Sequence, residues 1–123
     1  MSGISRSRAC VALLAVALAA CTSLVPRPLA PDVALLHAPI ADAHGNVALH
    51  PPLLEGVWGA LAAKRGVIVT VEKVVDDISP WSPFVRIPGH RVLVVIEAPF
   101  GAHPGGLYTG TLPVDGYGED YDF

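Results

Sequence analysis

A run of β-branched residues constrains the fold more than any other feature of this sequence. Residues 67–72 read VIVTVE, and Thr70 is the only polar residue before the final glutamate. A strand with one face in water alternates apolar and polar residues, whereas a strand covered on both faces is apolar throughout. Residues 91–98, RVLVVIEA, show a second run of this kind. The two runs predict strands of a parallel sheet with both faces covered.

The order of the predicted elements also indicates an α/β architecture. The elements are, along the chain, a buried strand at 32–39 that ends at Pro39, a turn at Gly45 and Asn46, a short strand at 47–49, a helix at 51–66, the strand at 67–72, strand character at 84–87 and the strand at 91–98. Strand, helix, strand, connection and strand predict one domain with an open, mostly parallel sheet and flanking helices.

The helical pattern carries its own start and stop signals. Pro51 and Pro52 suit the first turn of a helix, and Gly66 suits a left-handed stop. Lys64 and Arg65 would lie in the last turn, where positive charge favours the helix dipole. The spacing predicts one apolar stripe, formed by Leu54, Val57, Trp58 and Leu61.

The front of the chain, residues 1–23, is apolar and resembles a signal. Two arginines precede an apolar run at 9–20, which is short for a membrane span. Residues 18–21, LAAC, resemble a bacterial lipoprotein cleavage box with Cys21 as the lipidated residue. The alternatives are an ordinary apolar helix or a stretch that is not native to the domain. Residues 24–31, LVPRPLAP, predict a linker.

The composition argues against several functions. The net charge is −3 and no basic block occurs, so nucleic acid is not expected as a partner. Cys10 and Cys21 are the only cysteines, so residues 32–123 contain neither a disulfide framework nor a cysteine zinc site. The five histidines do not follow metal-ligand spacing on a helix, so no metal is expected.

Two carboxylates at the ends of apolar strands are candidate site residues. Glu72 and Glu97 each close such a run, and ligands of open α/β sheets collect at the carboxyl ends of the strands. Acids there can act as nucleophile or base. The favoured interpretation is structural, in which each glutamate caps its strand or pairs with a neighbour such as Lys73 or Arg91.

A loop rich in glycine and proline follows the last predicted strand. Residues 99–106 read PFGAHPGG, which does not match a GxGxxG phosphate loop. Glycine lets a backbone approach a partner or ligand closely, so the candidate interface residues are Gly101, His103, Gly105 and Gly106. His103 would donate a hydrogen bond to a substrate carboxylate; the alternative is a plain chain reversal with His103 on the surface. The tyrosine-rich residues 107–123 predict either an extended segment on a partner or a disordered end.

Four motifs together resemble one enzyme family. They are DVALLHAPIADAHGNV, VTVEKVVD, VRIPGHRVLVVIEAPFGAHPGGLY and GYGEDYDF, in this order. The set is similar to α subunits of class I coenzyme A-transferases, and the PFGAHP loop resembles the glutaconate coenzyme A-transferase branch. The same loop argues against a sugar-phosphate isomerase-like domain.

The resemblance implies an activity that two subunits share. Members move coenzyme A between an acyl-CoA and a carboxylic acid, through an anhydride and a glutamyl-CoA thioester. The nucleophilic glutamate is expected on a β-subunit partner, so no catalytic residue is assigned to this chain, which we expect to be inactive alone. The alternatives are a subunit of a related hydrolase that opens the ring of a cyclic acyl-CoA, and a lipid-anchored envelope protein without catalytic activity.

The resemblance also implies a domain organisation. Residues 32–123 correspond to part of an α subunit, and the family's longer front is atypical or truncated here, so the sheet is expected to be incomplete at its N-terminal side. An apolar sheet edge would then lack a partner. Because coenzyme A is a cytoplasmic substrate, a cytoplasmic location is expected; a membrane anchor through Cys21 is expected only if residues 1–23 are a real lipoprotein signal.

Overall fold

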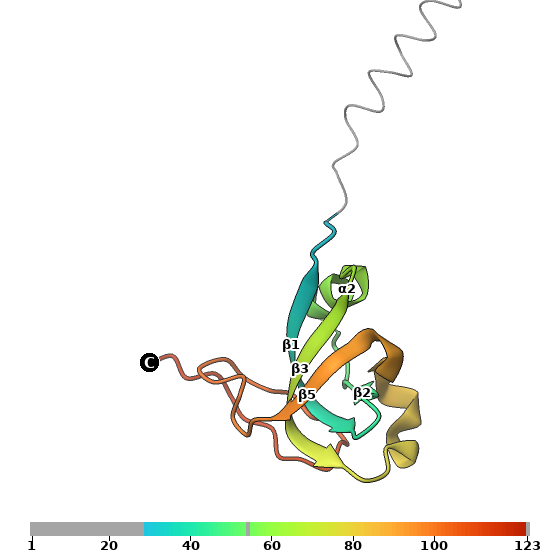
Figure 1. Ribbon diagram of the computed structural model, residues 1–123. Coiled ribbons are helices and arrows are strands. Elements are labelled where there is room, and N and C mark those ends of the chain that lie inside the picture. The colour runs from blue at the N-terminus through green and yellow to red at the C-terminus, as the bar shows by residue number, and fades with distance from the viewer. Residues whose placement is uncertain (1–28, 54, 123) are drawn as a thin grey trace, which may run out of the picture.

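The computed structural model describes residues 29–53 and 55–122, which form an open five-stranded sheet with an α-helix beside it (Figure 1). The strand order is β4-β2-β1-β3-β5. In chain order the elements are β1 (Val33–Asp42), β2 (Val47–Ala48), α2 (Glu55–Ala62), β3 (Gly66–Val75), the 3-10 helix η1 (Ser79–Phe84), β4 (Val85–Ile87), the 3-10 helix η2 (Gly89–Arg91) and β5 (Val92–Glu97). The expected α/β class is confirmed.

The long strand pairings of this sheet are parallel and the short ones antiparallel. β1 runs parallel to β3 along its whole length, with His37 opposite Thr70, and β3 runs parallel to β5. β2 pairs with β1 only at Ile40 and Ala41, and it continues to β4 in an antiparallel pairing that is equally short. The centre of the sheet is therefore parallel, as the apolar runs predicted.

Strand β1 passes through the proline that was expected to end it. It continues beyond Pro39 to Asp42, and Pro39 itself is buried. A proline cannot donate a ladder hydrogen bond and is tolerated in a strand where no partner needs its amide. Because β2 begins to pair only at Ile40, β1 has a stretch before that point with a strand partner on one side only.

Helix α2 is shorter than its predicted range of 51–66. It spans Glu55–Ala62, so the two prolines precede it in a bend. Lys64 and Arg65 lie beyond its last turn, where their backbone amides donate to the carbonyls of Pro31 and Asp32. Gly66 begins β3 with a φ of +138°, a conformation that favours glycine.

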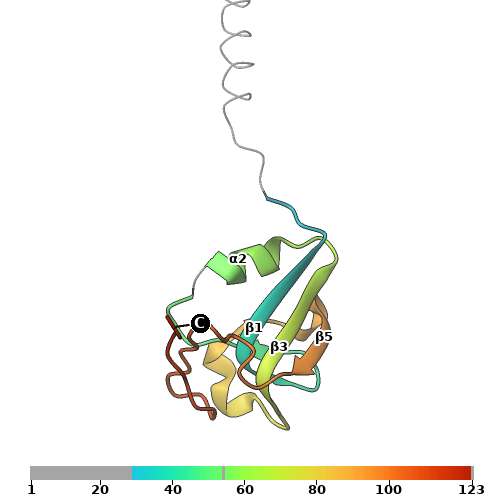
Figure 2. The same cartoon turned by 90° about the vertical axis from the view of Figure 1, so that its left-hand side faces the viewer.

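The buried face of α2 also differs from the predicted stripe. Trp58 is 68% exposed and Leu61 is 39% exposed, while Leu54 lies outside the described residues. Val57 of the stripe is buried as predicted, and the small residue Ala60 is also buried and packs in one cluster with Val69 and Val71 of β3. Small side chains let the helix lie close to the sheet, and Figure 2 shows α2 to one side of β1 and β3.

Only one face of the parallel strands is fully covered within the described residues. Leu35, Val94 and Ile96 share the face opposite α2 and are 79%, 46% and 46% exposed. The expectation that residues 91–98 form a strand covered on both faces is therefore wrong, because no described segment covers the face of β5 that carries Val94 and Ile96. Because β5 is as apolar as a buried strand, its sequence did not show that one of its faces is exposed.

The segment after β5 folds back onto the chain. Leu107 and Tyr117 form an isolated antiparallel bridge, and the Asp120 amide donates to the Pro104 carbonyl at 2.9 Å. In Figure 1 this segment lies at the carboxyl ends of the parallel strands. The expectation of a disordered end is thus wrong for the described part, whereas the expectation that the tail lies on a partner stays a prediction.

The signal-like segment at residues 1–23 and the first part of the linker at 24–31 lie outside the described residues. Across residues 29–53 and 55–122, no helix has both the length and the apolar character that a membrane crossing requires.

Candidate functional site

Two parallel strands bring a histidine and a glutamate together on the face opposite α2. His37 of β1 lies opposite Thr70 of β3, and Glu72 follows Thr70 by two residues, so the register places all three side chains on one face. His37 Nδ1 is 2.8 Å from the Thr70 hydroxyl, and His37 Nε2 is 2.8 Å from Glu72 Oε1. The carboxylate can only accept, so Nε2 carries the proton in this contact.

The Glu72 carboxylate also binds two parts of the C-terminal segment. The Tyr117 hydroxyl donates to Oε1 at 2.7 Å, and the Phe100 amide donates to Oε2 at 2.8 Å. The Glu72 side chain is only 9% exposed. We call this set of residues, Glu72 with His37, Thr70, Phe100 and Tyr117, the Glu72 clamp.

The clamp keeps its carboxylate ionised. Burial by itself raises the pKa of Glu72, but hydrogen bonds from the Phe100 amide, Tyr117 and His37 outweigh it and leave that pKa below its ordinary value. The same contact acts in the opposite direction on its partner, since burial and the hydrogen bond to Glu72 raise the pKa of Tyr117. With both oxygens occupied by donors, Glu72 serves as an anchor for the loop above it.

The loop at residues 99–106 is shaped to fit this anchor. Phe100 adopts a φ of +61°, which is uncommon for a residue with a side chain, and its amide bond to Glu72 holds it there. A Cβ on Gly101 would lie 2.6 Å from His37 Cε1, so only glycine fits against the ring. The Ala102 amide donates to the Tyr117 hydroxyl at 3.0 Å. The loop and the tail are thus fastened to the same carboxylate.

The other sequence candidates lie around the clamp without joining it. Glu97 accepts from the Val74 amide at 2.8 Å, which matches its expected role as a strand cap. His103 lies 3.3 Å from Asp120, with both side chains partly exposed. A Cβ on Gly106 would lie 3.1 Å from the Tyr117 carbonyl, and one on Gly105 would lie 3.0 Å from the Ala102 carbonyl. Among the predicted candidates, Glu72 is therefore part of the clamp, and Gly101 lies against the His37 ring of the clamp.

Two hollows flank the clamp. A polar one of about 570 Å³ contains both Glu72 and Glu97, with Lys73 between them in the sequence. The second, of about 290 Å³, lies between β1, α2 and the C-terminal loop, and we call it the aliphatic hollow. Its lining residues are Leu36, His37, Pro39, Leu49, His50, Pro52, Leu53, Gly56, Val57, Ala102, Gly106, Leu107 and Tyr108.

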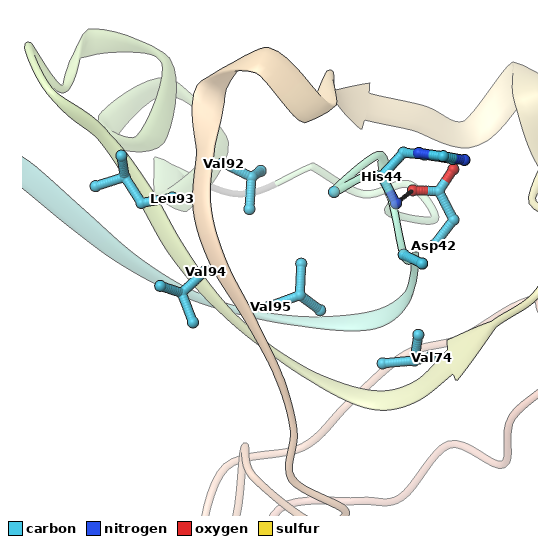
Figure 3. Close-up of a pocket in the computed structure, with 9 residues that line it drawn as sticks. Asp42, His44, Val74, Val92, Leu93, Val94 and Val95 are labelled. Atoms are coloured by element: carbon cyan, nitrogen blue, oxygen red, sulfur yellow. Dashed lines mark hydrogen bonds between the residues drawn. The ribbon is translucent and has the colours of Figure 1, made fainter.

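A third hollow, of about 300 Å³, lies between β5 and the turn after β1. Figure 3 shows Val92 and Val95 on the side of β5 toward this turn, with Leu93 and Val94 on the other side. Asp42 of the turn accepts from the amides of His44 and Asn46 and from the Asn46 side chain. The Asp42 carboxylate thus closes the turn, and the hollow combines the aliphatic wall of β5 with the His44 side chain.

Most of the chain matches a known protein family. The family model described as coenzyme A transferase matches residues 17–98, which is more than half of the chain. The chain belongs to the coenzyme A transferase family. The resemblance drawn from the four motifs is confirmed.

Relatives within this family include components of transferases and of a hydrolase. The chain is 43% identical over 79 residues to one subunit of the 3-oxoadipate CoA-transferase of Pseudomonas knackmussii, a match that covers 60% of this chain and 26% of that protein. It is 37% identical over 98 residues to the cholesterol ring-cleaving hydrolase IpdA subunit of Rhodococcus jostii, which covers 75% of this chain and 30% of that protein.

A solved structure shows the same fold. Glutaconate coenzyme A-transferase from Acidaminococcus fermentans matches with a TM-score of 0.63 and 35% identity, over 74% of this chain and 27% of that chain. The chain thus spans less than a third of the length of each of these three relatives. The CoA-transferase-like open sheet that the sequence predicted is confirmed.

Four clamp residues were not identified from the sequence: His37, Thr70, Phe100 and Tyr117. His37 lies in an apolar strand and Tyr117 in a tail of uncertain structure, so neither had a motif of its own. A partial signal existed, because Thr70 and Glu72 are two residues apart and therefore lie on the same face of β3. Their meeting with His37 depends on the β1–β3 register, which the sequence does not specify. Among the described residues no group of three or more metal-binding side chains occurs.

Proposed function

We propose that this coenzyme A transferase chain acts as an α-type subunit that moves coenzyme A between an acyl-CoA and a carboxylic acid. The observation that carries the proposal is the Glu72 clamp, which fixes the loop at 99–106 at the carboxyl ends of the parallel strands. This loop holds the motif most similar to the glutaconate coenzyme A-transferase branch, and that edge of an open α/β sheet is where ligands collect.

The catalytic nucleophile of the proposed reaction belongs to a partner β subunit. There, the carboxylate of a glutamate attacks the thioester carbonyl of acyl-CoA and releases the coenzyme A thiolate. The thiolate then attacks the glutamyl carbonyl of the resulting anhydride, which releases the donor acid as a carboxylate and leaves a glutamyl-CoA thioester. Glu72 is unsuited to this attack, since His37, Tyr117 and Phe100 occupy its two oxygens. We assign no catalytic residue to this chain, and we expect it to be inactive without the partner.

The chain's own contribution is to the walls of the shared site. The anchored loop includes Gly105 and Gly106, and Glu97 lies beside it at the end of β5. Gly101 keeps the loop close to His37. His103 is the candidate donor to a substrate carboxylate, with Asp120 at 3.3 Å to orient its ring. Coenzyme A enters as part of a substrate, and the proposed reaction needs no metal. Because coenzyme A is supplied in the cytoplasm, the proposal places the protein there.

A second candidate function is membership in a hydrolase that opens the ring of a cyclic acyl-CoA. It is favoured by the match to the cholesterol ring-cleaving hydrolase IpdA subunit, which covers 75% of this chain. The two functions differ in the fate of the thioester, because a transferase exchanges coenzyme A between acids while a ring-opening hydrolase keeps it on the product.

The test is reconstitution of the full chain with the β-type product of the adjacent gene. The transferase proposal predicts that the two proteins co-purify and that the pair transfers coenzyme A from an acyl-CoA to a free acid. Hydroxylamine would trap the glutamyl thioester on the partner. A pair that consumes cyclic acyl-CoA with no exchange would contradict the transferase and support the hydrolase.

Changing His103 to Ala in the reconstituted pair tests its proposed role. We expect the KM for the carboxylic acid to rise while the pair still assembles. Thr111→Ala, which alters an exposed residue of the C-terminal segment outside the three hollows, serves as the control. Unchanged affinity and turnover in the His103 variant would leave that histidine a surface residue.

A further inference from the structure

The aliphatic hollow is built from three segments that are distant in the sequence. Leu36 and Pro39 come from β1, Val57 comes from α2, and Leu107 comes from the loop that the Glu72 clamp holds in place. Its volume of about 290 Å³ lies at the lower limit of small-molecule sites, which run from about 300 to 1,000 Å³. The hollow therefore suits a small group.

The walls of this hollow select an apolar ligand. Among the described residues that line it there is no Asp, Glu, Lys or Arg. His37 lines it too, but both of its ring nitrogens are already paired with Thr70 and Glu72. A phosphate or another charge-dense group would lose its hydration here without gaining a partner.

One end of the hollow keeps polar capacity. His50 Nδ1 donates to the Pro51 carbonyl at 2.7 Å, which leaves its Nε2 with a lone pair. The His50 ring stacks on Phe84 and meets the Tyr108 ring edge-on, with centroids 5.1 and 5.2 Å apart, so its position is fixed. Tyr108 is 64% exposed, and its hydroxyl can donate to a carbonyl oxygen.

We propose that the aliphatic hollow binds the short acyl chain of the substrate, with the carbonyl end toward the Tyr108 hydroxyl, which donates to it, while His50 holds the Tyr108 ring in place. The proposal rests on the proposed coenzyme A-transferase function and names the substrate class of that site. The aliphatic side chains hold the carbon chain, and the nucleotide part of coenzyme A stays outside. A free acid and an acyl thioester share this chemistry, since both present an aliphatic chain that ends in a carbonyl.

The test is a titration of the isotopically labelled full chain, followed by methyl NMR, with sodium hexanoate in one arm and hexanoyl-CoA in the other. We expect the methyl signals of Leu36, Leu53 and Val57 to move saturably in at least one arm. Ala102→Leu fills the hollow and should weaken binding about tenfold or more. Ala43→Leu makes the same change at an exposed residue of the turn after β1 and should leave binding unchanged.

A second variant keeps the test decisive if Ala102→Leu disturbs the loop. Tyr108→Phe removes the hydroxyl and keeps the ring against His50, so it should weaken binding about threefold to tenfold. No saturable shift with either probe would overturn the proposal, as would equal binding by wild type, Ala102→Leu and Tyr108→Phe. Because binding is read on this chain alone, loss of coenzyme A exchange in the reconstituted pair would refute the proposed function separately.

Discussion

At the scale of single residues, Glu72 organises the candidate site. One carboxylate receives donors from β1, from the loop after β5 and from the tail, and these contacts span up to 45 positions of sequence separation. A carboxylate that accepts several hydrogen bonds holds chain segments together more strongly than a neutral acceptor. The residue predicted as a candidate site acid is therefore the main anchor of the site.

Replacing Glu72 with Gln should destabilise the protein by about 1 to 3 kcal/mol. Glutamine keeps the volume but presents an NH₂ group to donors from His37, Phe100 or Tyr117, so at least one buried donor loses its acceptor. Urea denaturation of the full chain measures the free energy of unfolding. Glu97→Gln is the matched control, because Glu97 is exposed and caps a single amide. Equal losses in the two variants would argue against the clamp.

Stability should also fall at acid pH because of Glu72. Its pKa is lower in the folded protein than its ordinary value of 4.5, so the unfolded state binds the proton more tightly. The stabilisation is present above pH 4.5 and is lost as the pH falls through the lower, folded pKa. Denaturation midpoints between about pH 6 and pH 3 measure this loss. A wild-type slope no steeper than that of Glu72→Gln would contradict the assignment.

At the scale of elements, the loop at 99–106 and helix α2 show how packing selects residue size. Gly101 lies against the His37 ring, and Ala60 lies against the sheet while the larger Trp58 of the same helix is exposed. Protein interiors are close-packed, so an added methyl group without space forces a shift. The glycine-rich loop is thus a fitted cover over β1 and β3, and its opening would expose the clamp.

Gly101→Ala should displace this loop and cost about 1 to 3 kcal/mol. The new Cβ would lie 2.6 Å from His37 Cε1 and 2.8 Å from the Ala98 carbonyl oxygen. Hydrogen exchange of the Phe100 and Ala102 amides should speed up, since both donate within the clamp. Gly118→Ala is the control, because no atom lies within 4 Å of its added Cβ. Slow exchange retained in Gly101→Ala would show that the loop tolerates the methyl group.

At the scale of the whole molecule, the described part has an open sheet, and β5 is one of its two edge strands. Strand β5 has a partner on one side only, and Leu93, Val94 and Ile96 are about half exposed. An exposed apolar edge strand is a site for pairing with another chain. In a family whose relatives are at least three times longer than the matched region, this edge is where further structure is expected to attach.

The full chain by itself should therefore associate in a concentration-dependent way. Val94→Lys places a charge on the exposed face of β5, and it should lower the apparent mass in light scattering after size exclusion. Ala43→Lys adds the same charge at the turn after β1 and should leave association unchanged. A wild-type chain that stays monomeric at all concentrations, or one whose association survives Val94→Lys, would show that β5 is not the contact.

Local chemistry determined a large part of this protein. The apolar runs at 67–72 and 91–98 specified strands, the glycine at position 45 specified a turn with a φ of +83°, and the four ordered motifs specified the family. These properties depend on neighbouring residues or on the order of segments along the chain. For that reason the α/β class and Glu72 were predictable, while the limits of α2 were misjudged.

Tertiary structure decided the rest, because it depends on which segments pack against which. The sequence could not distinguish the buried strand β3 from the exposed edge strand β5, since both are built mainly from β-branched and other apolar residues. Nor could it place Tyr117 beside Glu72, for a hydrogen bond across 45 positions follows from the strand register and from the path of the tail. Glu72 itself was predictable, but the meeting of His37, Phe100 and Tyr117 on its carboxylate is a property of the fold.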